Sequence, residues 1–451
     1  MENFLKRYFK GDYVIWVIYI LLVMFSISVQ YSAGASLIVE YGMSNFRNHI
    51  MFLLIGFIVL IAVYSLPRRY IKRIAWAMLA FAFVMQIAAY TSLGSPDNRR
   101  VFFFQPSEFT KFALIVITAY FIDRFQDADF LQKNFKLFFA IIWLPLVFII
   151  PSNGSTGIII ILPIVLMMMI GSIPWRKIGY FIGVPTLILG IVFAIAYFGV
   201  SEETYEKYRE EQEMSVAKVV VNVLDIPRVH TWVGRLGVYA ENNQAKRSQA
   251  DIKRDEQAER SECAIYDGRD PKLSGNSFWR NHIPQGWSDY IFSIIVEEYG
   301  IFGAIFVILL FLWLLRRAGV LVKKCETIYS AIVIVGVATV IVFQALVHIG
   351  VCTRLFPATG QPLPLISKGG TSILIMSAFF GLLLRMSCEL GDVDKKNVEK
   401  ESAGEKPEKD ISEDKSDKIL DNKNEVVEEK IDEIIEISEN EDEAKTIEIV
   451  F

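Results

Sequence analysis

The sequence predicts an all-α integral membrane protein with ten transmembrane helices. The mean hydropathy is +0.38 and 53% of the residues are hydrophobic. Apolar runs of about 20 residues, the length that spans a bilayer core, recur along the chain. A β-barrel is excluded because these runs are continuous and do not alternate apolar with polar residues. The ten runs lie at 13–32, 49–66, 72–93, 107–123, 136–151, 156–173, 178–200, 290–315, 328–350 and 364–386.

Two features of these runs bear on how the chain crosses the membrane. The first run is too long for a cleaved signal peptide and has no clear small-residue cleavage site, so we expect it to remain as an anchor. The fifth and sixth runs are separated only by Pro151-Ser-Asn-Gly-Ser155, which predicts a tight turn between two helices.

The distribution of basic residues predicts the orientation, because short loops rich in Lys and Arg stay in the cytoplasm. An N-terminus inside places all the basic clusters on the cytoplasmic side. Both termini are then cytoplasmic, and a large extracytoplasmic loop, 201–288, joins spans 7 and 8. The clusters are Lys6-Arg7 with Lys10, Arg68-Arg69 with Lys72-Arg73, Arg124 with Lys133 and Lys136, Arg176-Lys177, and Arg316-Arg317 with Lys323-Lys324.

The composition divides the chain into a polytopic membrane domain, 1–388, which includes the loop, and an acidic cytoplasmic tail, 389–451. The tail holds 23 acidic and 10 basic residues and has no aromatic residue before Phe451, so we expect it to be disordered. The loop is highly charged and is expected to be partly helical. No basic patch suits nucleic acid, and the four cysteines, Cys263, Cys325, Cys352 and Cys388, lack metal-ligand spacing.

With this orientation, the unusual motifs all lie at the outer face, which predicts one composite site there. "FFQPSEFTK" opens span 4, with Ser107 expected as the N-cap and with Glu108 and Lys111 spaced to pair on one helix face. "PSNGSTG", from Pro151, is the outer turn between spans 5 and 6.

The entry to span 10, Leu355–Ser372, is rich in proline and glycine. Such a segment cannot form a regular helix, so its backbone needs protein or water partners, and irregular backbone at membrane depth usually lines a cavity. Arg354 and Lys368 supply cations for an anionic ligand there. The alternative is that both side chains extend to the membrane interface without contacting a ligand.

Three carboxylates mark the start of span 8, in "QGWSDYIFSIIVEEYG". Asp289 is expected at the outer surface, where it need not be fully desolvated. In a straight helix Glu297 and Glu298 would lie roughly 12–14 Å deeper, where an ionisable residue is a functional candidate. The alternatives are that Asp289 caps the helix and that the glutamates pair with cations on a neighbouring helix.

Several long motifs together resemble the SEDS family of shape, elongation, division and sporulation proteins, to which FtsW and RodA belong. They are "QPSEFTK", "PWR" at Pro174–Arg176, "SGNSFWRNHIPQGWSDYIFSIIVEEYGIFG" and "FQALVHIGVCTRLFPATGQPLPLISKGGTS". The resemblance implies a peptidoglycan glycosyltransferase that polymerises lipid II. It also implies a multi-pass protein of the bacterial cytoplasmic membrane that works with a class B penicillin-binding protein. The "FKGDYVIW" start and the acidic tail favour an FtsW-like member, which acts with other division proteins at the septum.

The resemblance also assigns roles to residues. The family's catalytic aspartate corresponds to Asp289, a general base for the acceptor sugar hydroxyl. The departing pyrophosphate would be stabilised by Lys368, Arg354, Lys111 or a divalent cation, Mg²⁺ or Mn²⁺; no other cofactor is implied. The other candidates for the lining of the site are Glu108, Gln344, Glu297, Ser367, Gly369 and Gly370.

Three positions depart from the family pattern. Asn153 occupies a position that is commonly acidic, so we assign no acid or base role there. Lys368 replaces an aromatic residue, and His348 replaces an asparagine. Lys368 then either adds a phosphate contact or faces lipid headgroups.

Two other classes of function are compatible with ten spans that carry polar residues. A lipid II flippase or transporter would be expected to show charged or broken segments near the midplane in repeated halves, whereas here the unusual groups cluster at one face. A non-enzymatic division scaffold would tolerate replacement of Asp289.

Overall fold

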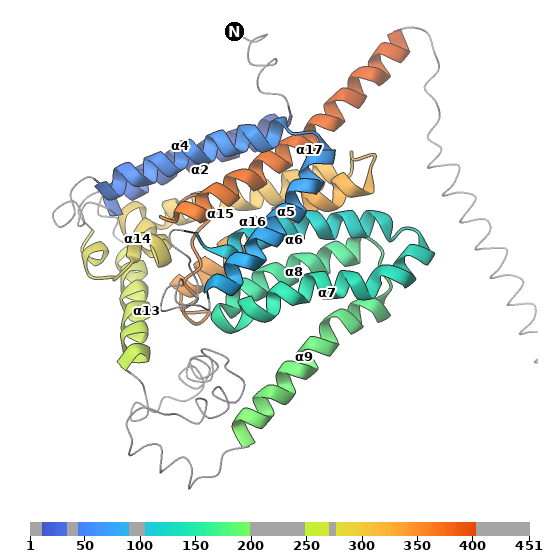
Figure 1. Ribbon diagram of the computed structural model, residues 1–451. Coiled ribbons are helices and arrows are strands. Elements are labelled where there is room, and N and C mark those ends of the chain that lie inside the picture. The colour runs from blue at the N-terminus through green and yellow to red at the C-terminus, as the bar shows by residue number, and fades with distance from the viewer. Residues whose placement is uncertain (1–10, 34–43, 90–103, 199–248, 270–276, 403–451) are drawn as a thin grey trace, which may run out of the picture. The chain divides into compact units, whose positions relative to one another are not determined.

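The computed structural model of the chain describes residues 11–33, 44–89, 104–198, 249–269 and 277–402, and their regular elements are helices (Figure 1). Contacts divide the chain into two units, Met1–Leu390 and Gly391–Phe451. Everything described below lies in the first unit, except that the last helix continues into the second as far as Ser402.

Ten helices in the described residues overlap the ten predicted spans. Seven of them, α2, α4, α5, α7, α15, α16 and α17, are long and apolar enough to cross a bilayer, and α8 is a shorter apolar helix. The regular elements of the described residues are therefore all helices, and most of them suit a membrane by length and composition. The helices are α2 (Tyr13–Ala33), α4 (Ser44–Ser65), α5 (Arg68–Ala89), α6 (Pro106–Arg124), α7 (Ala128–Ser152), α8 (Gly154–Ile170), α9 (Trp175–Phe198), α15 (Ile291–Val322), α16 (Ile328–Cys352) and α17 (Gly370–Ser402).

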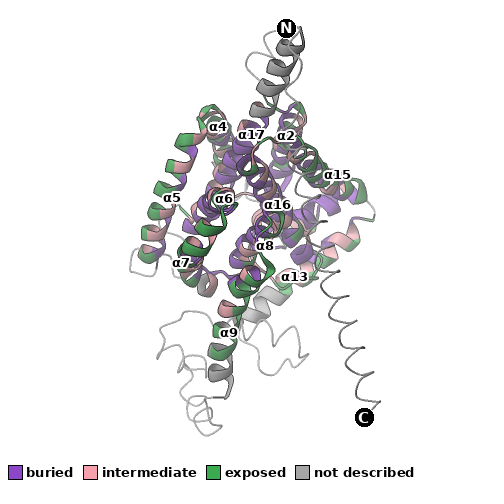
Figure 2. Cartoon of the chain, turned by 90° about the vertical axis from the view of Figure 1, so that its right-hand side faces the viewer, coloured by how far each residue is buried: buried purple, intermediate pink, exposed green. Residues whose placement is uncertain are grey.

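Burial separates central helices from peripheral ones. The buried share of the apolar stretch is 72% in α16 and 89% in α17, against 22% in α4 and α5. Figure 2 shows the buried residues concentrated where α6, α16 and α17 meet, and the exposed ones on the outer sides of α4, α5 and α7. The exposed residues of the outer helices include large hydrophobic side chains such as Leu54 and Ile58, as expected for surfaces that contact lipid.

Helix ends that were predicted to be cytoplasmic contact one another. Asp12, just before α2, accepts hydrogen bonds from Arg317 of α15 at 2.5–3.0 Å, and its backbone N–H donates to Ser387 of α17. Arg68, at the start of α5, donates to Thr327 and Ser330 at the start of α16. These contacts fit a common membrane face for the basic loops.

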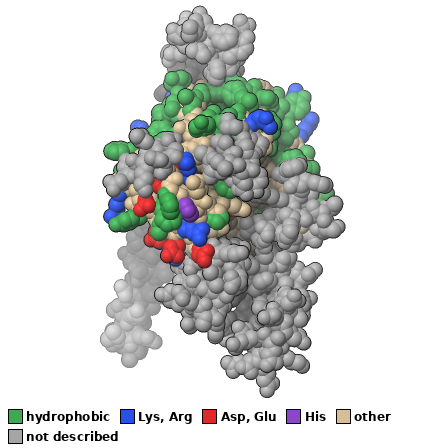
Figure 3. All heavy atoms as spheres, turned by 90° about the vertical axis from the view of Figure 1, so that its left-hand side faces the viewer, with side chains coloured by type: hydrophobic (Ala, Val, Ile, Leu, Met, Phe, Trp, Pro, Cys, Tyr) green, Lys and Arg blue, Asp and Glu red, His purple; other side chains and the backbone are tan. Residues whose placement is uncertain are grey.

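Part of the predicted outer loop is a helix, α13 (Gln249–Asp267), which confirms the partly helical expectation for that segment; 201–248 lies outside the described residues. Ser261 of α13 pairs with Ser293 of α15 at 2.5 Å between hydroxyl oxygens, and donates to the carbonyl oxygen of Cys352. Figure 3 shows the acidic side chains of this face gathered in its lower part, and hydrophobic side chains over its upper part.

Three expectations from the sequence were wrong in detail. The N-cap of α6 is Gln105, so Ser107 lies inside the helix, because Pro106 takes its first position. Asp289 does not begin α15, since Tyr290 interrupts the helix with φ −133° and ψ 28°. A second interruption lies at Gly300, whose φ of 66° falls in the region that favours glycine. The straight-helix depth expected for Glu297 and Glu298 therefore does not apply.

The last helix is longer than the predicted span 10. Helix α17 continues past 388 to Ser402, into the segment that was predicted to be a disordered tail. The rest of the predicted tail, from 403, and the short helix expected near Val426 lie outside the described residues. All four cysteines are free.

Candidate functional site

Asp289 ends a single helical turn, α14 (Gly286–Asp289), that stands apart from the long helix after it. The turn begins after Gln285, whose φ of +56° lies in the left-handed region, and the backbone N–H of Asp289 donates to the Gln285 carbonyl oxygen at 3.0 Å. The N-cap position of α15 is Tyr290, and Asp289 itself is half-buried. Asp289 therefore lies on a short turn whose position is set by its neighbours.

One neighbour is the segment 361–368, which we call the 361–368 loop. Its Ser367 hydroxyl donates to the carbonyl oxygen of Ser288 at 2.7 Å, and the Lys368 N–H donates to the carbonyl oxygen of Trp287 at 3.1 Å. The Ser367 oxygen also accepts from the Leu363 N–H, closing a tight turn. The two residues that precede Asp289 are thus fixed by backbone and hydroxyl groups of this loop.

Helix α2 holds the same two segments from the other side. The amide of Gln30 donates to the carbonyl oxygens of both Trp287 and Ile366, each at 2.9 Å. One turn earlier, Ser26 donates to Ile366 and pairs with His49 of α4. Gln30 is 3% exposed, so these bonds are made away from water and bind α14 to the loop rigidly.

The predicted pair of Glu108 and Lys111 is present and completely enclosed. The Lys111 ammonium lies 3.0 and 3.1 Å from the two Glu108 carboxylate oxygens, and neither residue is more than 1% exposed. Its third acceptor is the Gln344 side-chain oxygen of α16, at 2.7 Å. The Gln344 amide in turn donates to Pro362 in the 361–368 loop. This network fixes the loop to α6 and α16.

The other end of the loop is held by two of the three positions that depart from the family pattern, His348 and Asn153. The His348 Nδ1–H donates to the Gln361 carbonyl oxygen at 2.7 Å, since a carbonyl can only accept. The Gln361 amide reaches the turn between α7 and α8, where it donates to Thr156 at 2.8 Å and to Asn153 at 3.4 Å. Asn153 is therefore a structural contact of the loop.

The two glutamates of α15 have structural partners. Glu297 is fully buried and accepts from the backbone N–H groups of Phe278 and Trp279 and from the Ser277 hydroxyl. Glu298 accepts from Ser32 of α2 at 2.5 Å and lies 3.9 Å from Arg280. Both carboxylates fix the segment 277–280 against the helices. Glu298 lies near a cation, as in the alternative interpretation, whereas Glu297 is bonded to backbone N–H groups and a hydroxyl.

The remaining candidates separate into two groups. Arg354 forms an exposed ion pair with Glu262 of α13 at 3.2 Å, which ties it to the outer helix. Lys368 belongs to the 361–368 loop, and its partial burial lowers the pKa of its ammonium group below the ordinary value of 10.5. Gly369 and Gly370 follow directly and lead into α17; a Cβ on Gly370 would lie 2.7 Å from the Phe52 ring of α4.

The structure therefore brings Ser367 and Lys368 against the turn that carries Asp289. Glu108, Lys111 and Gln344 support the loop from behind, whereas Glu297 and Arg354 have other partners. Sequence reasoning missed Ser26, Gln30 and His49. The signal was present, because a serine and a glutamine one turn apart in an otherwise apolar span point to a polar interior contact.

This arrangement suits chemistry in which a proton is removed beside a negatively charged group. A half-buried carboxylate can accept a proton, and a nearby lysine can stabilise an anion. Among the described residues, no three His, Cys, Asp or Glu side chains gather in a way that could hold a metal ion.

Comparisons with known proteins agree with this fold. The profile of a family described as "Cell cycle protein", covering FtsW, RodA and SpoVE, matches residues 12–219 and 262–391. A probable peptidoglycan glycosyltransferase FtsW of Trichlorobacter lovleyi is 25% identical over 85% of this chain and 95% of its own length. The peptidoglycan glycosyltransferase MrdB of Escherichia coli is 22% identical over 83% and 92%.

Solved structures show the same fold. A chain from a peptidoglycan synthase complex superposes with a TM-score of 0.58 at 18% identity, covering 84% of this chain and 98% of that one. The rod shape determining protein RodA of Thermus thermophilus gives 0.53 at 16% identity, over 84% and 96%. With the family profile matched over more than half of its length, this chain belongs to the FtsW, RodA and SpoVE family of cell cycle proteins.

Proposed function

We propose that this protein is a peptidoglycan glycosyltransferase that polymerises lipid II at the outer face of the bacterial cytoplasmic membrane, with Asp289 as the general base. The observation that carries the assignment is the way the Asp289 turn is held. Carbonyl oxygens of Trp287 and Ser288 are bonded to the 361–368 loop, and Gln30 reinforces the contact from α2. Such convergence of three distant segments is expected where a reacting group must be positioned.

The comparisons support the class of enzyme. Relatives that span nearly the whole of the membrane domain carry the name peptidoglycan glycosyltransferase, among them the FtsW of Taylorella equigenitalis, at 24% identity over 82% of this chain and 95% of its own length.

In the reaction we propose, the Asp289 carboxylate takes the proton of the acceptor sugar's 4-hydroxyl. The resulting oxygen attacks the anomeric carbon of the lipid-linked sugar, the bond to the diphosphate breaks, and the configuration inverts. Lys368 is the best placed of the three predicted cations to stabilise the departing diphosphate, since it belongs to the loop that holds the Asp289 turn. Lys111 is enclosed by Glu108 and Gln344, and Arg354 is bonded to Glu262. A divalent cation remains a second proposed source of positive charge.

The proposed partner is a class B penicillin-binding protein, and the proposed place of action is the division septum, with other division proteins. A similar structure comes from a peptidoglycan synthase complex that coordinates polymerisation with crosslinking, the reaction that such a partner would supply. Among the relatives, several are named FtsW, which favours the division role. The ten-span topology with both termini cytoplasmic remains part of this proposal.

The experiment is a reaction of purified protein and its cognate transpeptidase with labelled lipid II, read as glycan polymer on a gel. We expect polymer from the complex. A parallel reconstitution in vesicles measures movement of labelled lipid II between leaflets. Translocation without polymer would replace the proposal with the transporter alternative, and neither activity would leave the scaffold role.

A further inference from the structure

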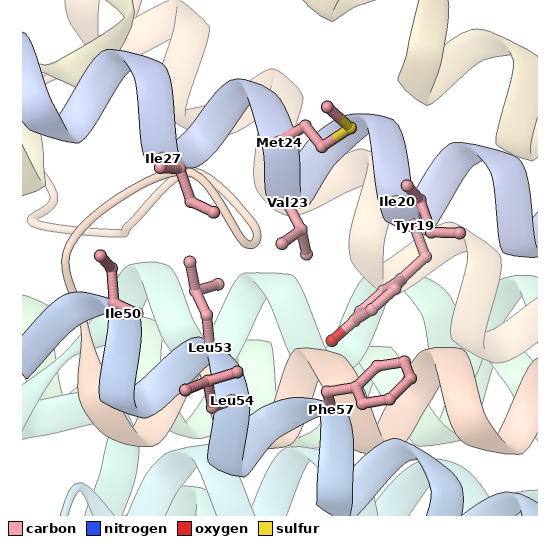
Figure 4. A pocket seen from close by; sticks show the side chains of 9 residues that line it. All are labelled: Tyr19, Ile20, Val23, Met24, Ile27, Ile50, Leu53, Leu54 and Phe57. Carbon is pink, nitrogen blue, oxygen red and sulfur yellow. The ribbon is translucent and has the colours of Figure 1, made fainter.

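Much of the exposed surface of the helix bundle is apolar and identifies no particular lipid. The groove between α2 and α4 is an example: Ile27 and Ile50 lie at one end of it and Tyr19 and Phe57 at the other, with apolar side chains between them (Figure 4). A surface of this kind suits the hydrocarbon chains of any lipid. The first two turns of α5 differ, because they present charged side chains on an exposed face.

The start of α5 carries four cationic side chains, and two of them have partners on α16 or just before it. The Arg68 guanidinium donates to the hydroxyl groups of Thr327 and Ser330. The Lys72 ammonium lies 4.3 Å from the centre of the Tyr329 ring, which is a cation–π distance. Both side chains are half-buried, so protein contacts account for these two charges.

The other two cations, Arg69 and Arg73, are exposed and gather around one aromatic ring. Their guanidinium carbons lie 5.0 and 6.0 Å from the centre of the Tyr70 ring. The two arginines are four residues apart, so they are neighbours on one face of the helix. Neither has a hydrogen-bond or ion-pair partner among the described residues. Two guanidinium groups without a counter-ion are thus held together at the end of a spanning helix.

The same face of α5 continues as an apolar stripe along the exposed outer side of the helix (Figure 2). Trp76, Ala80 and Val84 follow Arg73 at helical spacing, and all are exposed. The order from the helix start is therefore two guanidinium groups, an indole ring and aliphatic side chains, over about 22 Å from Arg69 to Val84. Phosphates, interface and hydrocarbon follow in the same order through one leaflet of a bilayer. This face therefore suits lipid, with its cations at the depth of the lipid phosphates.

We propose that Arg69 and Arg73 bind the headgroup phosphate of an anionic phospholipid in the leaflet at the start of α5. Charge complementarity favours this ligand over a zwitterionic lipid, because two cations without a carboxylate are balanced by a headgroup of net negative charge. Guanidinium groups form paired hydrogen bonds to phosphate oxygens and are weakly hydrated, which suits a site at the membrane surface. The site is independent of the proposed enzymatic activity, since no residue around Asp289 takes part in it.

The test measures the binding of single lipid molecules to the full-length protein in neutral detergent by native mass spectrometry. The probes are dioleoylphosphatidylglycerol and dioleoylphosphatidylcholine, which share acyl chains and differ in net charge. Arg69→Gln with Arg73→Gln removes both cations of the site. The matched control is Arg316→Gln with Lys324→Gln, which removes two exposed cations from the same predicted membrane face, in α15 and just after it.

We expect the wild type and the control to bind phosphatidylglycerol more tightly than phosphatidylcholine. Each cation near a membrane surface contributes a factor of about five, so the Arg69 and Arg73 double variant should bind phosphatidylglycerol about thirtyfold more weakly. Its affinity for phosphatidylcholine should not change. Because both arginines are exposed, the variant should unfold at the wild-type temperature in the same detergent.

Three results would overturn the proposal. An equal loss of phosphatidylglycerol affinity in the control would show a diffuse attraction to all the basic loops of this face. Equal affinity of the wild type for the two lipids would make the face an ordinary lipid contact. Tyr70→p-benzoylphenylalanine should form a photo-crosslink to phosphatidylglycerol in membranes, and a crosslink to an acidic protein or to the acidic segment 403–451 would replace the lipid as the occupant.

Discussion

Replacing Lys111 with alanine should damage the fold as much as the reaction. The Lys111 ammonium is 0% exposed and contacts both oxygens of Glu108 and the side-chain oxygen of Gln344. Without it, the Glu108 carboxylate, 1% exposed, remains as an uncompensated buried charge. Breaking a buried ion pair in this way costs about 3–5 kcal/mol. The side-chain oxygen of Gln344 would also lose the hydrogen bond that it accepts from Lys111. The hydrogen bond from the Gln344 amide to Pro362 in the 361–368 loop would then be weakened.

The assay for Lys111→Ala is thermal unfolding of the purified protein, together with its level in membranes and polymerisation per folded molecule. The exposed Lys133→Ala is the control and should behave like the wild type. The double variant Glu108→Leu with Lys111→Met removes both charges, so it should recover most of the lost stability. Wild-type stability and membrane level in Lys111→Ala, with polymerisation abolished, would refute the structural role and make Lys111 a reacting or substrate-binding group.

Three further predictions concern the supports of the site. Glu297→Gln should lower the free energy of unfolding by about 1–3 kcal/mol, because the backbone N–H groups of Phe278 and Trp279 lose a charged acceptor. The polymerisation rate per folded molecule should not change. Loss of activity at full stability would contradict this prediction. Gly370→Ala should lower the melting temperature, since its Cβ would lie 2.7 Å from the Phe52 ring, and the added substitution Phe52→Leu should restore part of it. The pKa of Lys368 is lowered by burial, so the unfolded chain binds more protons at this group, and stability should rise as pH increases from its folded pKa toward 10.5. Lys368→Met should lose this alkaline gain in thermal unfolding, and an identical pH dependence in both proteins would contradict the assignment.

The sequence was sufficient to predict the helices, because each is a long apolar run and the bilayer imposes its length. It also predicted the Glu108–Lys111 pair, whose spacing of three places both residues on one helix face. The breaks at Tyr290 and Gly300 could not be predicted from hydropathy, which is the same for a straight helix and an interrupted one. They depend on tertiary contacts, such as those that fix Trp287 and Ser288 to the 361–368 loop.

The hydrogen-bond partners of Glu297 and Glu298 could not be predicted from the sequence either. Glu297 is bonded to a segment 18–20 residues earlier, and Glu298 to Ser32, 266 residues away. No local pattern distinguishes such anchors from catalytic groups, so Glu297 remained a candidate for the site until its contacts were known. His49 was missed because one histidine in an apolar span carries no signal without the position of Ser26, its partner on α2.

The most direct test of the account is glycan polymerisation by the complex with Asp289→Asn, which keeps the size of the side chain and removes the base. The matched control is Glu262→Gln, which neutralises an exposed carboxylate of α13 that pairs with Arg354. Both complexes must assemble with the transpeptidase as the wild type does. The account predicts normal polymer from Glu262→Gln and none from Asp289→Asn. Equal polymer from Asp289→Asn would contradict it, and the general base would then have to be another group.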